Sequence, residues 1–279
     1  MFSRWFRRRK PKQPEPPGRD VEELARGIRR PAVHIVATIP RGTSFFGGAP
    51  SIAPDPWPSK NGKRLDFLAQ IDLAQAQAVF SMDGLPKRGA LLVFYDVQGN
   101  PWGFDPKDQG GWAVIHQDVS SGDLTPHGST DRAEPAHGRV PVSFRLIHRY
   151  PSWERGEVEA LQLSETESEA LSELADREFN EQPRHHLGGF PDPIQGDWME
   201  RECQLASNGI FCGDEKYLKD PRVPELEKGA ADWRLLLQLD SDTRAGFSWG
   251  DCGMLYFFVR EQDLRAGDLS KVWMISQCH

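Results

Sequence analysis

A pattern that occurs twice constrains the fold of this chain more than any other feature of its sequence. Residues 67–72 form an apolar run that ends in Gln-x-Asp, and residues 235–240 repeat that pattern. A Gly-Gly-x-Pro motif precedes each run, at residues 47–50 and 188–191. After each run a glycine, at position 89 or 253, opens a second apolar run. Three elements that recur in the same order predict an internally duplicated fold with two related lobes.

Length and composition indicate a globular domain built mainly from strands. The chain has 279 residues, enough for a sizeable core, with 38% hydrophobic and 27% charged residues. Its 22 prolines and 26 glycines favour many turns and short strands over long helices. We therefore expect an α+β fold in which the sheet dominates and a few helices are peripheral.

The sequence divides into an arm and one domain. Residues 1–19 are basic and proline-rich, as expected of an arm and linker, and residues 20–279 form the domain. Its two pseudo-repeats cover about 32–150 and 183–279, joined by a helix at about 164–182. Two helix starts are marked by an N-cap residue and a glutamate three positions later, at Asp20 with Glu23 and at Ser164 with Glu167.

Charge separates the arm from the body. Residues 1–12 contain six of the 34 basic residues and no acid, so the remainder has 28 basic against 41 acidic residues, a net charge of −13. An acidic body argues against nucleic-acid binding, which requires a basic face.

The arm has two interpretations. Phe2, Trp5 and Phe6 would share one side of a helix among arginines, a composition typical of weak contact with an anionic membrane. Alternatively, the arm is only a basic tail before a linker. No apolar run approaches the roughly 20 residues of a transmembrane helix, and no signal peptide is expected.

Motifs of catalysis and cofactor binding are missing. The sequence lacks GxGxxG after a strand, the Walker pattern and GxSxG, so no catalytic residue is identified and a role without catalysis is favoured. The four cysteines form no CxxC pair, which indicates a reduced, cytoplasmic setting. Two histidines and two aspartates within residues 185–197 match no standard zinc spacing, and no metal or cofactor is expected.

The repeated polar pair supplies the first candidate ligand contacts. Residues two apart in a strand face the same side, so Gln70 would project with Asp72, and Gln238 with Asp240. The two pairs together could form a polar site between the lobes. The alternative is that each Gln and Asp satisfies backbone groups at a strand end or turn.

A second group of candidates surrounds the repeated glycine. Trp249 and Asp251 stand in a glycine-rich segment where they could bind and orient a ligand, and His186 lies beside the second Gly-Gly-x-Pro motif. The alternative is a tight connection between strands with Trp249 in the core. The complete set of candidate ligand-binding residues is Gln70, Asp72, His186, Gln238, Asp240, Trp249 and Asp251.

These motifs resemble those of the bacterial YwqG-like family, also called DUF1963, a domain of unknown function. The matching segments lie in the same order over roughly residues 30–279, at 68–73, 85–95, 187–197, 236–240, 249–258 and 272–277. The resemblance implies a sheet-rich, internally duplicated fold and no established reaction. It also implies a setting among bacterial toxin-immunity genes.

Three functions are consistent with these observations. We expect first a cytoplasmic bacterial interaction protein, immunity-like, whose acidic body suits a basic, toxin-like partner. The second is a small-ligand sensor or enzyme with a polar pocket between the lobes. The third is association with a membrane surface through residues 1–12.

Overall fold

The computed structural model describes residues 19–39, 42–124, 136–178 and 180–279. The expectations for the N-terminal arm up to residue 18, and for residues 125–135 of the polar segment at 120–139, lie outside the described residues.

Ten strands form one antiparallel sheet in the order β12-β11-β10-β9-β1-β8-β2-β5-β6-β7. A separate hairpin pairs β3 with β4. The strands are β1 (Arg30–Ala37), β2 (Phe45–Phe46), β3 (Ser59–Lys60), β4 (Lys63–Arg64), β5 (Asp66–Asp72), β6 (Ala90–Tyr95), β7 (Trp112–Gln117), β8 (Val140–Arg149), β9 (His186–Gly188), β10 (Trp233–Asp240), β11 (Met254–Arg260) and β12 (Trp273–Gln277).

Seven α-helices lie within the described part of the chain, which confirms the expected sheet-rich α+β class. Helix α5 packs on β10 and β12, while α1 packs on α4. The helices are α1 (Val21–Ile28), α2 (Leu73–Val79), α3 (Gly156–Glu159), α4 (Glu165–Glu178), α5 (Met199–Ala206), α6 (Val223–Leu226) and α7 (Glu261–Arg265), with 3₁₀ turns η1 (Pro106–Asp108), η2 (Glu215–Lys219), η3 (Glu227–Asp232) and η4 (Leu269–Lys271).

The local helix signals act as the sequence predicts. The side chain of Asp20 accepts hydrogen bonds from the backbone N–H groups of Glu22 and Glu23, which starts α1. At α4, Glu167 N–H donates to Ser164 Oγ at 3.2 Å, and Ser164 N–H donates to Glu167 Oε2 at 2.8 Å. Both helix starts are thus fixed locally, and the α4 helix ends at Glu178, short of the expected residue 182.

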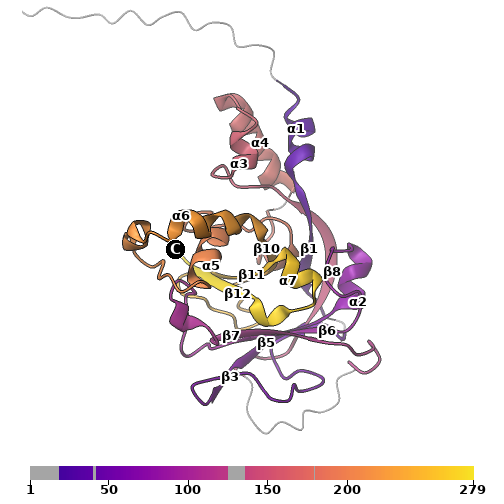
Figure 1. Cartoon of the computed structure of the whole chain (residues 1–279). Coiled ribbons are helices and arrows are strands. Elements are labelled where there is room, and N and C mark those ends of the chain that lie inside the picture. The colour runs from indigo at the N-terminus through magenta and orange to yellow at the C-terminus, as the bar shows by residue number, and fades with distance from the viewer. Residues whose placement is uncertain (1–18, 40–41, 125–135, 179) are drawn as a thin grey trace, which may run out of the picture.

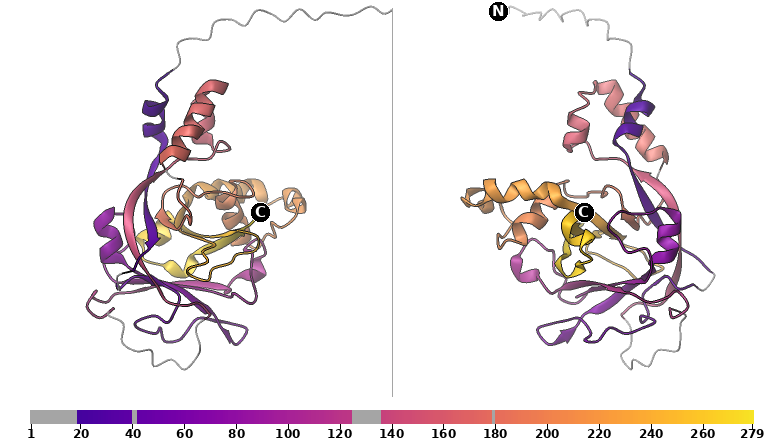
Figure 2. Two further views of the ribbon diagram at one scale, coloured as in Figure 1. Left: turned by 180° about the vertical axis from the view of Figure 1, so that it is seen from behind. Right: turned by 45° about the vertical axis from the view of Figure 1, so that its right-hand side comes forward.

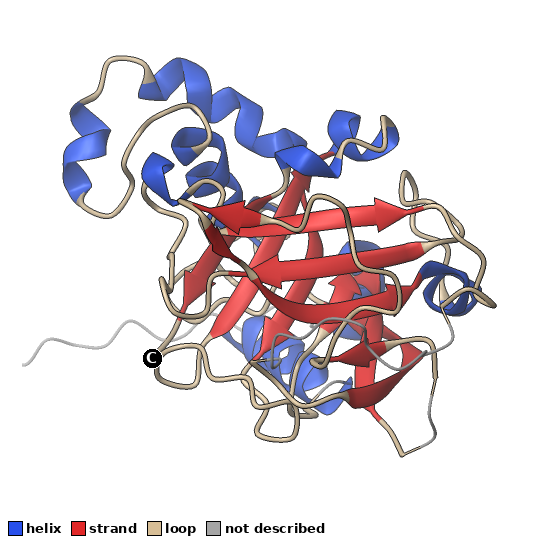
Figure 3. Cartoon of the chain, turned by 90° about the horizontal axis from the view of Figure 1, so that it is seen from below, coloured by secondary structure: helices blue, strands red, loops and turns tan. Residues whose placement is uncertain are grey.

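The sheet curls into a nearly closed barrel (Figure 3), and two tryptophans join its edges. The rings of Trp112, on β7, and Trp273, on β12, are 5.1 Å apart in an edge-on contact. Trp112 Nε1 donates to Val272 O at 2.9 Å, and Trp273 Nε1 donates to Gly103 O at 2.8 Å. These contacts hold the two edge strands together without ladder hydrogen bonds between them.

The strand order has the same number of strands on each side of a central pair. β1 and β8 pair with each other, β2-β5-β6-β7 continues from β8, and β9-β10-β11-β12 continues from β1. β5 and β10 carry an irregularity of register at corresponding positions, between Phe67 and Ala69 and between Leu235 and Leu237. All ten strands nevertheless share one sheet, so the expected two lobes do not stand apart as separate bodies.

Helices α1, α3 and α4 gather at one end of β1 and β8, beyond the rest of the sheet (Figures 1 and 2). A small cluster that includes Ala25, Leu171 and Leu174 packs α1 against α4. Among the described residues, no helix has the length and apolar character needed to cross a membrane.

Candidate functional site

A pocket of about 820 Å³ lies beside the end of β10 and the turn that leads into β11. Its ionisable side chains are mainly carboxylates, and we name it the acid-lined pocket. Four aspartates and one arginine line it, together with polar and aromatic residues such as Ser241 and Phe247. The charged members are Arg184, Asp192, Asp240, Asp242 and Asp251.

Glycine allows the tight turn that forms one wall. Gly253 N–H donates to Trp249 O at 2.8 Å, and a Cβ at Gly253 would lie only 2.2 Å from that same oxygen. Gly250 has a φ of 57°, in the region that favours glycine. A larger residue at position 253 would displace the turn that carries Asp251 to the pocket.

Asp240 is a poorly solvated carboxylate of this pocket. Its Oδ2 accepts from Arg184 N–H at 2.7 Å, and the residue is 5% exposed. Burial raises the pKa of Asp240, and the hydrogen bond from Arg184 N–H opposes that rise. A cation placed beside Asp240 would therefore stabilise its ionised form.

Asp242 is held in the charged state. Burial acts to raise its pKa, but hydrogen bonds from the His185 ring and from Arg244 lower it to about 2. The His185 Nε2 to Asp242 Oδ2 distance is 3.4 Å, and Arg244 N–H donates to Oδ1 at 2.9 Å. Asp242 is thus ionised at neutral pH, and Arg244, whose Nε lies 3.3 Å from Oδ1, pairs with it.

Asp192 is positioned from beneath by buried groups. Its carboxylate pairs with Arg149, and its Oδ2 accepts from Gln238 Nε2 at 2.9 Å. The fully buried His186 ring lies with Nε2 at 3.4 Å from the same oxygen. Burial and the nearby Arg149 lower the pKa of His186, so the ring is neutral and adds no charge.

The structure brings together only part of the candidate set derived from the sequence. Asp240 and Asp251 line the acid-lined pocket. Gln238 and His186 lie behind Asp192, and the core residue Trp249 donates from Nε1 to Asp240 O at 3.1 Å. The two remaining candidates, on β5, are fully buried and absent from the pocket lining, so any ligand contact by Gln70 or Asp72 stays a prediction.

The two Gln-x-Asp motifs make corresponding hydrogen bonds with backbone. Gln70 Oε1 accepts from Ser51 N–H at 2.8 Å, and Gln238 Oε1 accepts from Asp192 N–H at 2.9 Å. Both donors directly follow the proline of Gly-Gly-x-Pro. These contacts match the alternative interpretation, in which each Gln satisfies backbone groups.

The aspartates of the motifs also correspond. Asp72 Oδ2 accepts from Thr43 Oγ1 at 2.7 Å, and Asp240 Oδ2 accepts from Arg184 N–H at 2.7 Å. Asp72 Oδ1 in addition accepts from Ala74 N–H at 3.0 Å and so starts α2. Both carboxylate oxygens of Asp72 are therefore engaged by protein groups, whereas Asp240 faces a pocket.

Three charged residues of the pocket, Arg184, Asp192 and Asp242, are not among the candidates derived from the sequence. Asp192 follows the Gly-Gly-x-Pro motif directly, and Asp242 comes two residues after the Gln-x-Asp motif. The nearness of Asp192 and Asp242 to a repeated motif was a signal that could have identified these two residues. Arg184 carries no comparable signal.

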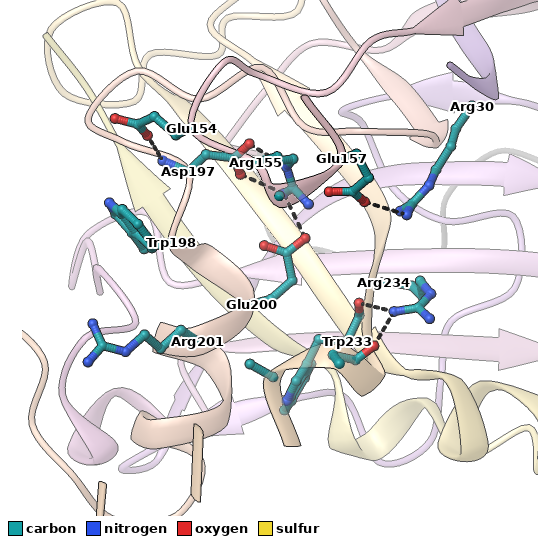
Figure 4. A pocket seen from close by; sticks show the side chains of 13 residues that line it. Arg30, Glu154, Arg155, Glu157, Asp197, Trp198, Glu200, Arg201, Trp233 and Arg234 are labelled. Carbon is teal, nitrogen blue, oxygen red and sulfur yellow. Dashed lines mark hydrogen bonds and ion pairs between the residues drawn. The ribbon is translucent and has the colours of Figure 1, made fainter. Parts of the chain in front are cut away.

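A second pocket, of about 370 Å³, contains an ion-pair network (Figure 4). Arg155 is its centre, with Nη2 at 2.5 Å from Asp197 Oδ1 and 2.7 Å from Glu200 Oε1. Four arginines and four acids line this pocket, so its formal charges balance. We interpret the network as a clamp between the segments around Arg155 and the start of α5.

The described residues contain no group of three or more His, Cys, Asp or Glu side chains suited to holding a metal ion. Cys203 and Cys212 are buried free thiols on and near α5. Burial raises the pKa of Cys203, and burial raises that of Cys212 to about 12. Both are therefore thiols at neutral pH, which disfavours a role as nucleophiles.

Comparison with known proteins identifies the family. No curated protein matches the chain. The model of DUF1963, a domain of unknown function, matches residues 44–278. That match covers most of the chain and confirms the resemblance carried by the repeated motifs. The chain belongs to the DUF1963 family.

Proposed function

We propose that this protein is a binding protein that recognises a cationic group, an amine or a guanidinium, through the acid-lined pocket. The observation that carries the proposal is Asp240, only 5% exposed, beside Asp251 in the lining, because the other two aspartates, Asp192 and Asp242, already pair with Arg149 and Arg244. A carboxylate in such a poorly solvated position gains more from a cation than an exposed one does.

The proposed ligand is a lysine or arginine side chain of a basic partner protein. The body outside residues 1–12 has a net charge of −13, which would accelerate encounter with a basic, toxin-like partner in the bacterial cytoplasm. An immunity-like role needs no catalytic step, and none is proposed.

A small cationic ligand is the second candidate. The volume of about 820 Å³ lies within the range of roughly 300–1,000 Å³ that is usual for small-molecule sites. The same aspartates would bind the ligand in either case, so a simple cationic probe tests both candidates.

We also propose that the domain arose from two copies of one unit, β1-β2-β5-β6-β7 and β8-β9-β10-β11-β12. The balanced strand order supports this proposal, as do the corresponding irregularities of β5 and β10. The paired contacts of Gln70 with Ser51 and of Gln238 with Asp192 support it as well.

Replacing Asp240 with asparagine is expected to weaken binding of a cation by about tenfold, equivalent to about 1.4 kcal/mol, because the variant keeps the shape and loses the charge. Calorimetric titration with a trilysine peptide and with spermidine measures the effect. Affinity should also fall as pH decreases through the raised pKa of Asp240, because the protonated carboxyl no longer attracts a cation.

Asp118→Asn is the matched control, since it removes the same charge from an exposed aspartate outside the pocket lining. Asp251→Asn supplies a second pocket variant. The proposal fails if the wild-type protein binds neither probe, or if the Asp240 and Asp251 variants bind as tightly as the Asp118 control. A retained peptide affinity with no spermidine binding would favour the protein partner over the small ligand.

A further inference from the structure

A pocket lined mainly by basic side chains lies at the ends of helices α1 and α4. Its volume is about 590 Å³, and it is formed where the end of α1 and the end of α4 meet β8. Arg29, Arg145, His148 and Arg177 line it together with one acid, Glu181. We name it the basic pocket, and it shares no lining residue with the acid-lined pocket.

The charge of the basic pocket stands out against the rest of the protein. Three arginines face one glutamate in its lining, whereas the body as a whole has 41 acidic and 28 basic residues outside the first twelve positions. A concentration of positive charge on an acidic body is not explained by overall composition. It indicates a site for an anion.

The ion pairs already present are weak enough to be exchanged. Arg145 Nη2 lies 2.6 Å from Glu181 Oε2, but their side chains are 44% and 58% exposed. Arg177 Nη2 lies 3.1 Å from Glu22 Oε1, with both side chains more than 60% exposed. Pairs this exposed contribute about 0–1 kcal/mol each, so an incoming anion can take over their arginines at little cost.

Guanidinium chemistry selects the kind of anion. The fork of N–H donors on an arginine matches two oxygens of a phosphate, and several arginines in one concave site favour a doubly charged group. Arg145 is also oriented by an additional contact, since its Nε donates to the buried His34 Nδ1 at 3.0 Å. This hydrogen bond holds the Arg145 side chain at Nε, so its terminal nitrogens have a defined orientation.

We propose that the basic pocket binds a phosphate group, carried either by an anionic lipid or by a soluble phosphate compound. The position of the pocket adds a reason. Helix α1, whose C-cap residue Arg29 lines the pocket, follows in sequence the arm of residues 1–12, which has six basic and three aromatic residues. Figures 1 and 2 show α1 beside α4 at that end of the molecule.

The test uses the full chain and a double variant, Arg145→Gln with Arg177→Gln. Its matched control is Arg88→Gln with Arg222→Gln, two exposed arginines in ion pairs elsewhere. Calorimetric titration with inorganic pyrophosphate measures binding of a soluble phosphate compound. Flotation with phosphatidylglycerol vesicles, compared with phosphatidylcholine vesicles, measures binding of an anionic lipid. The pocket variant should bind at least tenfold more weakly in one assay or both, and the control within about twofold of wild type.

The two assays distinguish the sources of the phosphate. Loss of pyrophosphate binding with unchanged flotation assigns the pocket to a soluble ligand, and loss of flotation alone assigns it to a lipid. Equal weakening in the pocket and control variants would overturn the proposal, as would the absence of binding by the wild-type protein in both assays. So would flotation that is abolished by deleting residues 1–12 and untouched by the pocket variant, with no pyrophosphate binding. Matching melting temperatures of the two double variants establish that folding is not the cause.

Discussion

Replacing Arg155 with alanine is expected to lower the free energy of unfolding by about 3–5 kcal/mol, because the change strips a buried carboxylate of its counter-ion. The Asp197 side chain is fully buried, and that of Arg155 is 11% exposed. Although burial acts to lower the pKa of Arg155, the carboxylates of Asp197 and Glu200 raise it, in agreement with a tight charge cluster. Urea denaturation at neutral pH measures the loss.

An exposed ion pair provides the contrast for this variant. Arg222 pairs with Asp220 at 2.7 Å, but its side chain is 55% exposed, so Arg222→Ala should cost no more than about 1 kcal/mol. The double variant Arg155→Leu with Asp197→Leu should be less destabilised than Arg155→Ala, since the fully buried carboxylate of Asp197 is removed together with its counter-ion and only the partly exposed Glu200 loses its partner. Similar losses for Arg155→Ala and Arg222→Ala would show that the clamp contributes little.

Replacing Gln238 with leucine is expected to destabilise the fold by about 3–5 kcal/mol, because it keeps the volume and removes three hydrogen bonds in the core. Gln238 accepts from Asp192 N–H and donates to Arg184 O at 2.8 Å and to Asp192 Oδ2 at 2.9 Å. Each buried partner left unsatisfied costs about 1–3 kcal/mol. Chemical denaturation followed by tryptophan fluorescence checks the result.

The corresponding residue extends this prediction to the first copy of the motif. Gln70 also makes three hydrogen bonds, at 2.7, 2.8 and 3.0 Å, and is fully buried, so Gln70→Leu should cost a similar amount. Gln195→Leu, at an exposed position, should change stability by no more than about 0.5 kcal/mol. A Gln70 variant as stable as the Gln195 control would argue against equivalent roles for the two motifs.

Features that depend on near neighbours along the chain were predicted well. The N-caps at Asp20 and Ser164 involve residues two or three positions away, and β5 and β10 contain the apolar runs that end in Gln-x-Asp. Helix α5 was not predicted. Its buried Gln204 accepts from Trp233 Nε1 at 2.9 Å, so a polar residue occupies the core through a partner 29 positions away.

The candidate site was predicted in part for the same reason. The recurring motifs directed attention to Asp240, but they could not show that Asp240 faces a pocket while Asp72 caps a helix. That difference arises from what lies beyond each strand end. Cysteine spacing likewise gave no sign that Cys203 and Cys212 are both buried.

The sequence by itself determined the family, the sheet-rich class, the helix starts and the contrast between a basic arm and an acidic body, because each depends on residue type or short spacing. Only the tertiary structure decided which charges meet. Arg29, Arg145 and Arg177 converge from three elements, and Asp192 joins Gln238 from 46 positions away. Hydrogen bonds and electrostatic interactions act over a few ångströms in space, whatever the separation of the residues along the chain.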